Sequence, residues 1–249
     1  MPAAPKHAAP MPAGLTPLSL ALLVAAAVAA VADWSVVAGA DSRATVAAGR
    51  GTAQAAAQGT APRAGSRARL VTKPLVLVLL IGVALTLTPQ DPAVRACFVV
   101  ALAFSLAGDV ALLSERGFAA GLAAFLLAHV AYAVGFVAGG VGAVPLAVGL
   151  GAMLVFDAVL ARRLVPALRG SGHDTLVPPV LAYMAAITAM VATAAGSAVA
   201  LAVVGAVLFA ASDALLADGR FVRRRRHGDL AVMALYHLGQ ACLVLSLVA

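Results

Sequence analysis

Long apolar stretches alternate along the chain with short segments that carry most of its charges. A helix of about 20 apolar residues spans the hydrocarbon core of a bilayer. We find eight such stretches, with approximate limits Leu15–Val31, Lys73–Pro89, Ala93–Leu113, Phe118–Ala138, a fifth that ends near Arg162, Leu176–Ala195, Ala198–Ala217 and Leu230–Val248. The pattern predicts an all-α fold, a polytopic membrane bundle of about eight transmembrane helices.

The N-terminal quarter of the chain differs from the rest. We expect a tail over residues 1–14, a first transmembrane helix over 15–33 and a catalytic bundle of seven helices over 71–249. Residues 34–70 are rich in Ala, Gly and Arg without a sustained apolar period, which predicts a mobile cytoplasmic loop. The first helix could also be a signal peptide, but one Lys and several prolines before it favour a retained helix.

Composition excludes a soluble domain. Of the 249 residues 63% are hydrophobic and 11% are charged, and the mean hydropathy is +1.03. A soluble fold of this length needs more polar residues to cover its surface. The formal charge of +7 would suggest nucleic acid, but the basic residues occupy loops and no basic patch is interleaved with aromatics. We therefore expect membrane lipids and no nucleic acid as partners.

The positive charges orient the predicted bundle. When successive loops are assigned to alternate sides, one side receives all of the 17 Lys and Arg residues except Lys6 and Arg95. Basic loops stay cytoplasmic, so both termini are predicted to lie outside. The expected location is a bacterial inner (plasma) membrane.

A short sequence recurs, with small changes, in two predicted helices. Residues 107–113 read AGDVALL and residues 211–216 read ASDALL, and the two copies lie four helices apart. Helices separated by an even number run in the same direction, so a parallel 4+4 repeat would explain this recurrence. Chance similarity between Ala/Leu-rich helices is the alternative.

Polar side chains within the helices are the candidates for chemistry, because each is costly in a membrane unless it has a partner or a function. Asp109 and Asp213 are predicted to be catalytic, since they lie deeper than charged anchors need to and have no basic residue within one turn. The predicted substrate-binding residues are Lys73, His129, Tyr132, Asp157, Tyr183, Tyr236 and Gln240.

Simpler interpretations stand beside these. Lys73 could reach the headgroups at the membrane edge, and Asp157 could pair with a neighbouring arginine. The histidines and tyrosines could be packing residues with satisfied polar atoms. The predicted orientation nevertheless gathers nearly all the polar groups in the cytoplasmic half, which favours one polar cavity on that side. No metal-binding spacing occurs, and we expect neither metal nor cofactor.

The ordered set of motifs resembles the YhhN-like lysoplasmalogenase family of membrane proteins. The matching pieces are Lys73-Pro74, Phe104 to Asp109, Phe118, Gly121-Leu122, Phe125, His129, Tyr132, Gly205 to Phe209, Ser212-Asp213, Tyr236 and Gln240. No piece is specific by itself, but their order and spacing are. The resemblance begins at Lys73, so it does not cover the first helix.

The resemblance implies eight helices and hydrolysis of the vinyl-ether bond of lysoplasmalogens to a fatty aldehyde and glycerophosphoethanolamine or glycerophosphocholine. Two aspartates in unlike environments fit this reaction, because it needs an acid and a second carboxylate. Which aspartate is the acid stays open. Lys73 would hold the phosphate, and the other polar side chains would orient water and glycerol.

Two other functions remain open at this stage. A proton-coupled small-molecule or lipid transporter could use the same buried carboxylates as relays, although the outer half of the predicted bundle holds few polar groups. A non-catalytic lipid-binding protein would tolerate replacement of both aspartates. The oligomeric state cannot be predicted from these patterns.

Overall fold

The computed structural model describes residues 14–49, 63–89, 91–223, 225 and 227–249. Its α-helices are α1 (Pro17–Gly49), α3 (Arg63–Thr86), α4 (Pro92–Ala111), α5 (Phe118–Gly139), α6 (Ala143–Gly170), α7 (Val177–Gly196), α8 (Ala200–Phe221) and α9 (Gly228–Leu245). Short 3-10 turns cover Glu115–Gly117, Asp174–Leu176 and Ser246–Val248. The predicted tail apart from Gly14, together with Lys6, Arg50, Arg224 and Arg226, lies outside the described residues.

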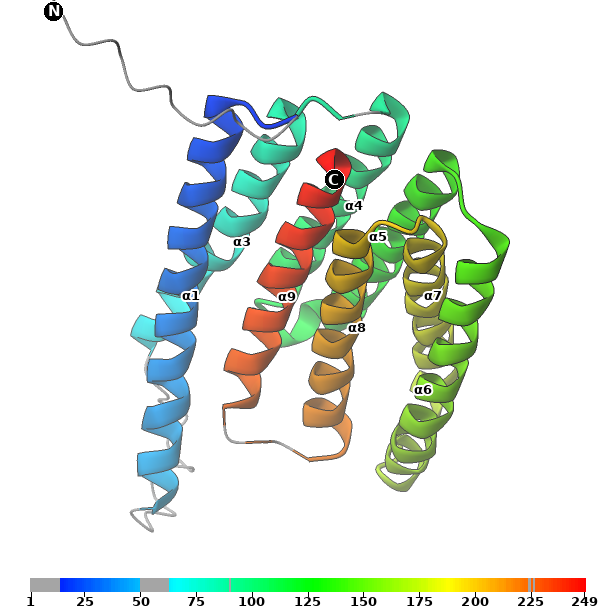
Figure 1. The fold of residues 1–249 in the computed structure, drawn as a ribbon. Helices are drawn as coiled ribbons and strands as arrows, with labels where there is room; N and C mark the ends of the chain where they lie inside the picture. Colours follow the sequence, from blue (N-terminus) through cyan, green and yellow to red (C-terminus); the bar gives the residue numbers. More distant parts are fainter. Residues whose placement is uncertain (1–13, 50–62, 90, 224, 226) are drawn as a thin grey trace, which may run out of the picture.

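These eight helices of the described part are all long and apolar enough to cross a membrane. They form one bundle in which successive helices alternate in direction, and the start of α1 and the C-terminus lie at the same end (Figure 1). The predicted all-α polytopic bundle is confirmed. The protein is an integral membrane protein by the length and composition of its helices.

In the expected loop over residues 34–70, the described residues 34–49 and 63–70 are helical, which corrects the sequence prediction for those residues. Helix α1 continues through Trp34 to Gly49, and α3 begins at Arg63. Alanine and arginine are strong helix formers, so a stretch without an apolar period can still extend a helix beyond the membrane. Residues 50–62 lie outside the described part of the chain.

Two further helix limits differ from the prediction. Pro74 was expected near the first turn of its helix, but it lies inside α3, where it removes one backbone hydrogen bond. Helix α6 continues past Arg162 to Gly170 and is 28 residues long, about 42 Å at 1.5 Å per residue. The arginines expected in the following loop are therefore on its last turns.

Neighbouring helices pack in the same order in the two halves of the chain. In the first half α1 packs on α3 and α4 on α5, and in the second half α6 packs on α7 and α8 on α9. Contacts between α5 and α7 and between α9 and α1 join the halves. The parallel repeat remains a prediction.

Close backbone contact fixes α8 against α9. A Cβ atom on Gly205 would lie 2.8 Å from the Gly239 carbonyl oxygen, and one on Gly239 would lie 2.9 Å from the Gly205 carbonyl oxygen. Glycine at both positions lets the helices approach without side chains between them. Nearer the other end of the pair, the Ser212 hydroxyl donates to the Val232 carbonyl at 3.0 Å. The two contacts set how α8 and α9 present Asp213 and Tyr236.

One end of the bundle carries most of the basic residues, and we call it the basic end. It holds the α4–α5, α6–α7 and α8–α9 connections, shown at the bottom of Figure 1 for α8–α9. Among the described Lys and Arg residues only Arg95 lies at the opposite end, where its side chain donates to the Leu87 carbonyl. That the basic end faces the cytoplasm remains a prediction.

Candidate active site

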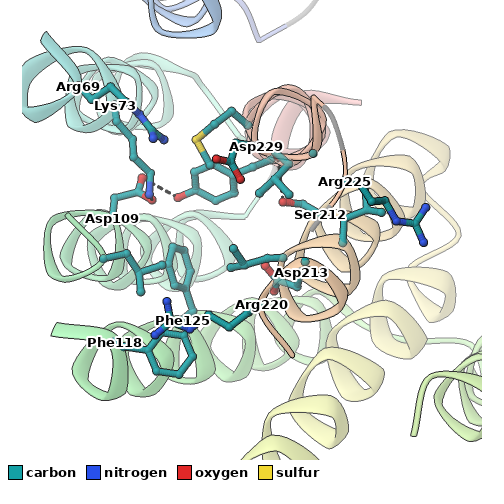
Figure 2. Close-up of a pocket in the computed structure, with 18 of the residues that line it drawn as sticks. Arg69, Lys73, Asp109, Phe118, Phe125, Ser212, Asp213, Arg220, Arg225 and Asp229 are labelled. Carbon is teal, nitrogen blue, oxygen red and sulfur yellow. Dashed lines mark hydrogen bonds and ion pairs between the residues drawn. The ribbon is translucent and has the colours of Figure 1, made fainter. Parts of the chain in front are cut away.

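A cavity of about 490 Å³ opens at the basic end and reaches into the bundle. Helices α3, α4, α5, α8 and α9 line it. Its outer part is formed by Ser114, Gly219, Arg225, Gly228 and Asp229, beside the α4–α5 and α8–α9 connections. Lys73, Asp109 and Asp213 line the same cavity (Figure 2). Tyr236 also lines it. The cavity therefore brings together both predicted catalytic aspartates and two of the predicted binding residues.

Asp109 is held by a cation and a phenol. The Lys73 ammonium lies 2.9 Å from Asp109 Oδ1, and the Tyr236 hydroxyl donates to Oδ2 at 3.0 Å. The Asp109 side chain is 1% exposed and the Lys73 side chain 6% exposed. Since a buried carboxylate is costly alone, the ion pair and the hydrogen bond compensate its loss of water. Lys73 is thus part of the site rather than a side chain that reaches the membrane edge.

Asp213 has different partners. The Tyr183 hydroxyl of α7 donates to Asp213 Oδ2 at 2.7 Å, and His129 Nε2 of α5 lies 3.3 Å from the same oxygen. The Asp213 side chain is 11% exposed, more than that of Asp109. Three helices meet at this carboxyl group, and they differ from those that hold Asp109.

The hydrogen bonds of His129 locate a proton. His129 Nδ1 lies 2.6 Å from the Phe125 carbonyl oxygen, which can only accept, so Nδ1 carries a hydrogen. In a neutral ring Nε2 then has a lone pair and faces a carboxylate oxygen that also only accepts. The contact of Nε2 with Asp213 becomes attractive when a proton resides on one of the two groups. His129 Nε2 and Asp213 Oδ2 are therefore placed so that they can share one proton.

Aromatic rings separate the two carboxyl groups. Phe125 meets Phe209 and Tyr236 edge to face, with ring centroids 6.2 and 5.8 Å apart. Phe209 also packs against Tyr236 at 5.3 Å and against His129 at 4.6 Å. A Cβ on Gly108 would lie 2.6 Å from the Phe125 ring, so glycine beside Asp109 makes room for this ring. The rings give the space between the aspartates apolar walls.

A second, apolar cleft of about 70 Å³ adjoins the cavity. It runs between α5, α6, α7 and α8, and its apolar lining includes Leu122, Phe156, Leu160, Ile187 and Ala217. Phe118, Asp213, Leu216 and Arg220 line both spaces. Asp213 consequently lies at the junction between a polar cavity and an apolar cleft.

Two predicted binding residues lie apart from the cavity. The Tyr132 hydroxyl donates to Gln240 Oε1 at 2.6 Å, and Gln240 Nε2 donates to Ser105 Oγ at 3.0 Å. All three side chains are fully buried, and none lines either of the two spaces. This group joins α4, α5 and α9 beneath the site.

Asp157 lines the apolar cleft rather than the polar cavity. Its carboxylate accepts a hydrogen bond from the Thr188 hydroxyl of α7. Asp157 is half-buried and its partner lies on the next helix, which differs from the simpler interpretation that it pairs with a neighbouring arginine. Asp157 thus lies on the cleft wall away from Asp109. The predicted role of Asp157 in substrate binding stays a prediction.

Several cavity residues were not predicted from the sequence. Arg69 lies one helical turn before Lys73 and lines the same cavity, and Arg220 places its guanidinium 4.4 Å from the Phe118 ring centre. The spacing of Arg69 and Lys73 at i and i+4 was the available signal, but the helix was expected to begin at Lys73. Arg220 and Ser212 required knowledge of which faces of α8 meet the cavity.

The chain was compared with known proteins. The model of the YhhN family matches residues 68–247, from the start of the membrane-spanning part of α3 to near the C-terminus. No curated protein and no solved structure matches the chain significantly. The match covers Lys73, Asp109, Asp213 and every other cavity-lining residue named above, but not α1. Since it spans well over half of the 249 residues, the protein belongs to the YhhN family.

Proposed function

We propose that the protein is a membrane hydrolase that cleaves the vinyl-ether bond of lysoplasmalogens. The products are a fatty aldehyde and glycerophosphoethanolamine or glycerophosphocholine. The proposal combines membership of the YhhN family with the arrangement of the cavity and the cleft.

The position of Asp213 is the observation that carries the proposal. A lysophospholipid has a charged head and one chain, which suit the polar cavity and the narrow apolar cleft respectively. In such a molecule the vinyl ether lies where the chain meets glycerol. With the head in the cavity and the chain in the cleft, that bond comes to lie at the junction beside Asp213.

The first step is protonation of the vinyl group. The proton shared by His129 and Asp213 is transferred to the vinyl carbon further from the ether oxygen. The electrons of the double bond form the new C–H bond, which leaves an oxocarbenium ion. The Phe125 and Tyr236 rings line the cavity and favour a cation beside them.

The second step consumes one water molecule. Water attacks the oxocarbenium carbon and loses a proton, and Asp109 provides the carboxylate that stabilises the cation and accepts this proton. The resulting hemiacetal then collapses. Its hydroxyl proton passes to the His129/Asp213 pair, its C–O bond to glycerol breaks, the glycerol oxygen takes the proton that Asp109 accepted, and the aldehyde is released. The acid proton is restored, so the reaction needs no further reactant.

Basic side chains at the cavity provide for the phosphate. Arg69 and Arg220 line the cavity at its α3 and α8 walls. A guanidinium binds phosphate oxygens through two N–H groups at once. Lys73 was predicted to hold the phosphate, but its ammonium already contacts Asp109, so we assign the phosphate chiefly to Arg69 and give Lys73 the role of holding Asp109.

The test is aldehyde release from lysoplasmenylethanolamine by the purified protein in detergent. Wild-type protein should release aldehyde, and Asp109→Asn should release it about 10²-fold more slowly. In D₂O the aldehyde should carry one deuterium on the carbon next to the carbonyl, because the acid proton is added there. Asp91→Asn is the matched control, since Asp91 caps α4 at the opposite end and asparagine caps a helix equally well.

Lysolipids with an ester or a saturated ether in place of the vinyl ether serve as substrate controls. Neither forms an oxocarbenium ion on protonation of a carbon, so neither should be cleaved. A folded wild-type protein that leaves all three lipids intact would reject the hydrolase and favour a carrier or a lipid-binding protein.

A further inference from the structure

Helix α1 lies outside the region matched by the family model, yet it carries a fully buried carboxylate. Asp33 Oδ1 accepts a hydrogen bond of 2.6 Å from the Thr72 hydroxyl of α3. Asp33 Oδ2 is buried and has no hydrogen bond within the described residues. An acid in this position is costly in a membrane, so its presence calls for a role.

The next residue of α1 forms a second polar contact, with α9. The Trp34 indole N–H donates to His237 Nδ1 at 3.0 Å, and the two rings stack with an interplanar angle of 21°. The bond fixes the His237 tautomer with its hydrogen on Nε2, because Nδ1 is the acceptor. His237 is buried, so this hydrogen bond gives one of its ring nitrogens a partner.

The partners of α1 are direct neighbours of the two residues that hold Asp109. Thr72 precedes Lys73 in α3, and His237 follows Tyr236 in α9. Lys73 and Tyr236 contact the two oxygens of Asp109. Two consecutive residues of α1, Asp33 and Trp34, therefore form hydrogen bonds with α3 and α9 next to the residues that contact Asp109.

We propose that Asp33 and Trp34 of α1 are positioning residues that, through Thr72 and His237, set Lys73 and Tyr236 against Asp109. The catalytic part of this proposal rests on the proposed function. Helix α1, which the family model does not cover, thereby helps to position the side chains of this protein's site. Without these two bonds α3 and α9 keep their apolar packing but lose the side-chain hydrogen bonds that fix their rotation at this level.

The activity test uses two variants. Trp34→Phe keeps an aromatic ring but removes the indole N–H, and Thr72→Val keeps the side-chain shape but removes the hydroxyl. Each should lower kcat about five- to tenfold with KM little changed, because one positioning hydrogen bond is lost while the cavity stays intact. Thr72→Ser keeps the hydroxyl and should restore the rate. Thr193→Val is the matched control, since the Thr193 hydroxyl bonds only within its own helix.

A cycle with Asp109 separates positioning from loss of fold. If Thr72 acts through Asp109, Thr72→Val should cause no further loss of rate in the Asp109→Asn background. Wild-type rates for both Trp34→Phe and Thr72→Val, or equal losses in both backgrounds, would overturn the proposal.

A second test needs no catalysis. Trp34 is the only tryptophan of the chain, so its indole N–H gives a single resonance in a ¹⁵N-labelled sample. Asp109→Asn should shift this resonance, because it releases Lys73 and Tyr236, whereas Asp157→Asn should not. If the wild type releases no aldehyde, the hydrolase proposal fails, and the resonance still decides whether α1 is coupled to Asp109: a shift supports the coupling and an unmoved resonance overturns it.

Discussion

The two aspartates of the candidate site, Asp109 and Asp213, have different surroundings, although the sequence around them is similar. Asp109 contacts the Lys73 ammonium and the Tyr236 hydroxyl and is almost inaccessible. Asp213 contacts a histidine and a tyrosine and lies at the mouth of the apolar cleft. Similar segments thus present the same acid to different neighbours.

The difference shows how one residue type can supply two functions. A carboxyl group between a cation and a hydroxyl donor is held as an acceptor, whereas one that faces a histidine lone pair can share a proton. An acid and a carboxylate are what vinyl-ether hydrolysis requires. The neighbours on the facing helices, rather than the aspartates themselves, carry this distinction.

The largest expected effect comes from Asp213. Asp213→Asn removes the acid proton and should lower kcat by about 10²- to 10⁴-fold, with little change in thermal stability. Aldehyde release and thermal unfolding in the same detergent measure the two quantities. Retention of near wild-type activity in this variant, with loss in Asp109→Asn, would reverse the roles assigned to the two sites.

Removal of the cation at the other site should chiefly affect stability. Lys73→Met leaves Asp109 as an unpaired buried charge and should destabilise the protein by about 3–5 kcal/mol. The double variant Lys73→Met/Asp109→Asn should regain much of this loss, because it no longer has an unpaired charge at position 109. Denaturant unfolding in detergent gives the three values, and a double variant no more stable than Lys73→Met would contradict the ion-pair argument.

The apolar side of the Asp213 site can be tested by chain length. Ala217→Phe narrows the cleft and should raise KM about tenfold for long-chain substrates while short-chain substrates are little affected, since roughly two buried methylenes account for such a change. Ala120→Phe, on an exposed position of α5, is the control. An equal change of KM for all chain lengths would mean that the chain binds elsewhere.

The smallest effect is expected for Tyr132, which the sequence analysis placed with the binding residues. Tyr132→Phe leaves Gln240 without its donor and should cost about 1–3 kcal/mol of stability, with kcat changed less than about twofold. Tyr236→Phe should have the larger effect on kcat, since Tyr236 contacts Asp109. If Tyr132→Phe affects kcat more strongly than Tyr236→Phe, the buried group beneath the site takes part in binding.

The sequence was sufficient for the bundle, because a run of about 20 apolar residues specifies a spanning helix by its length. Asp109 and Asp213 could be selected for a related reason, since a carboxyl group in such a run is costly. Asp33 was not selected, because the predicted first helix ended at residue 33, whereas α1 continues to Gly49.

The pairing of side chains between helices could not be read from the sequence. Which face of α5 meets α8 depends on crossing angles and on close contacts such as that between Gly205 and Gly239. The sequence therefore grouped Tyr132 and Gln240 with Tyr236, because they share helix faces with other candidates. The structure assigns Gln240 to a bond with Tyr132, away from the cavity.

In the proposed reaction, the junction at Asp213 also determines where the two products go. A lipid split there would be divided between two surroundings: the aldehyde half would be left in the apolar cleft between α5, α6, α7 and α8, and the glycerophosphate half in the cavity at the basic end. One half can leave sideways into the bilayer and the other into water. Products that depart into different phases meet each other rarely, so the geometry itself opposes reversal of the reaction.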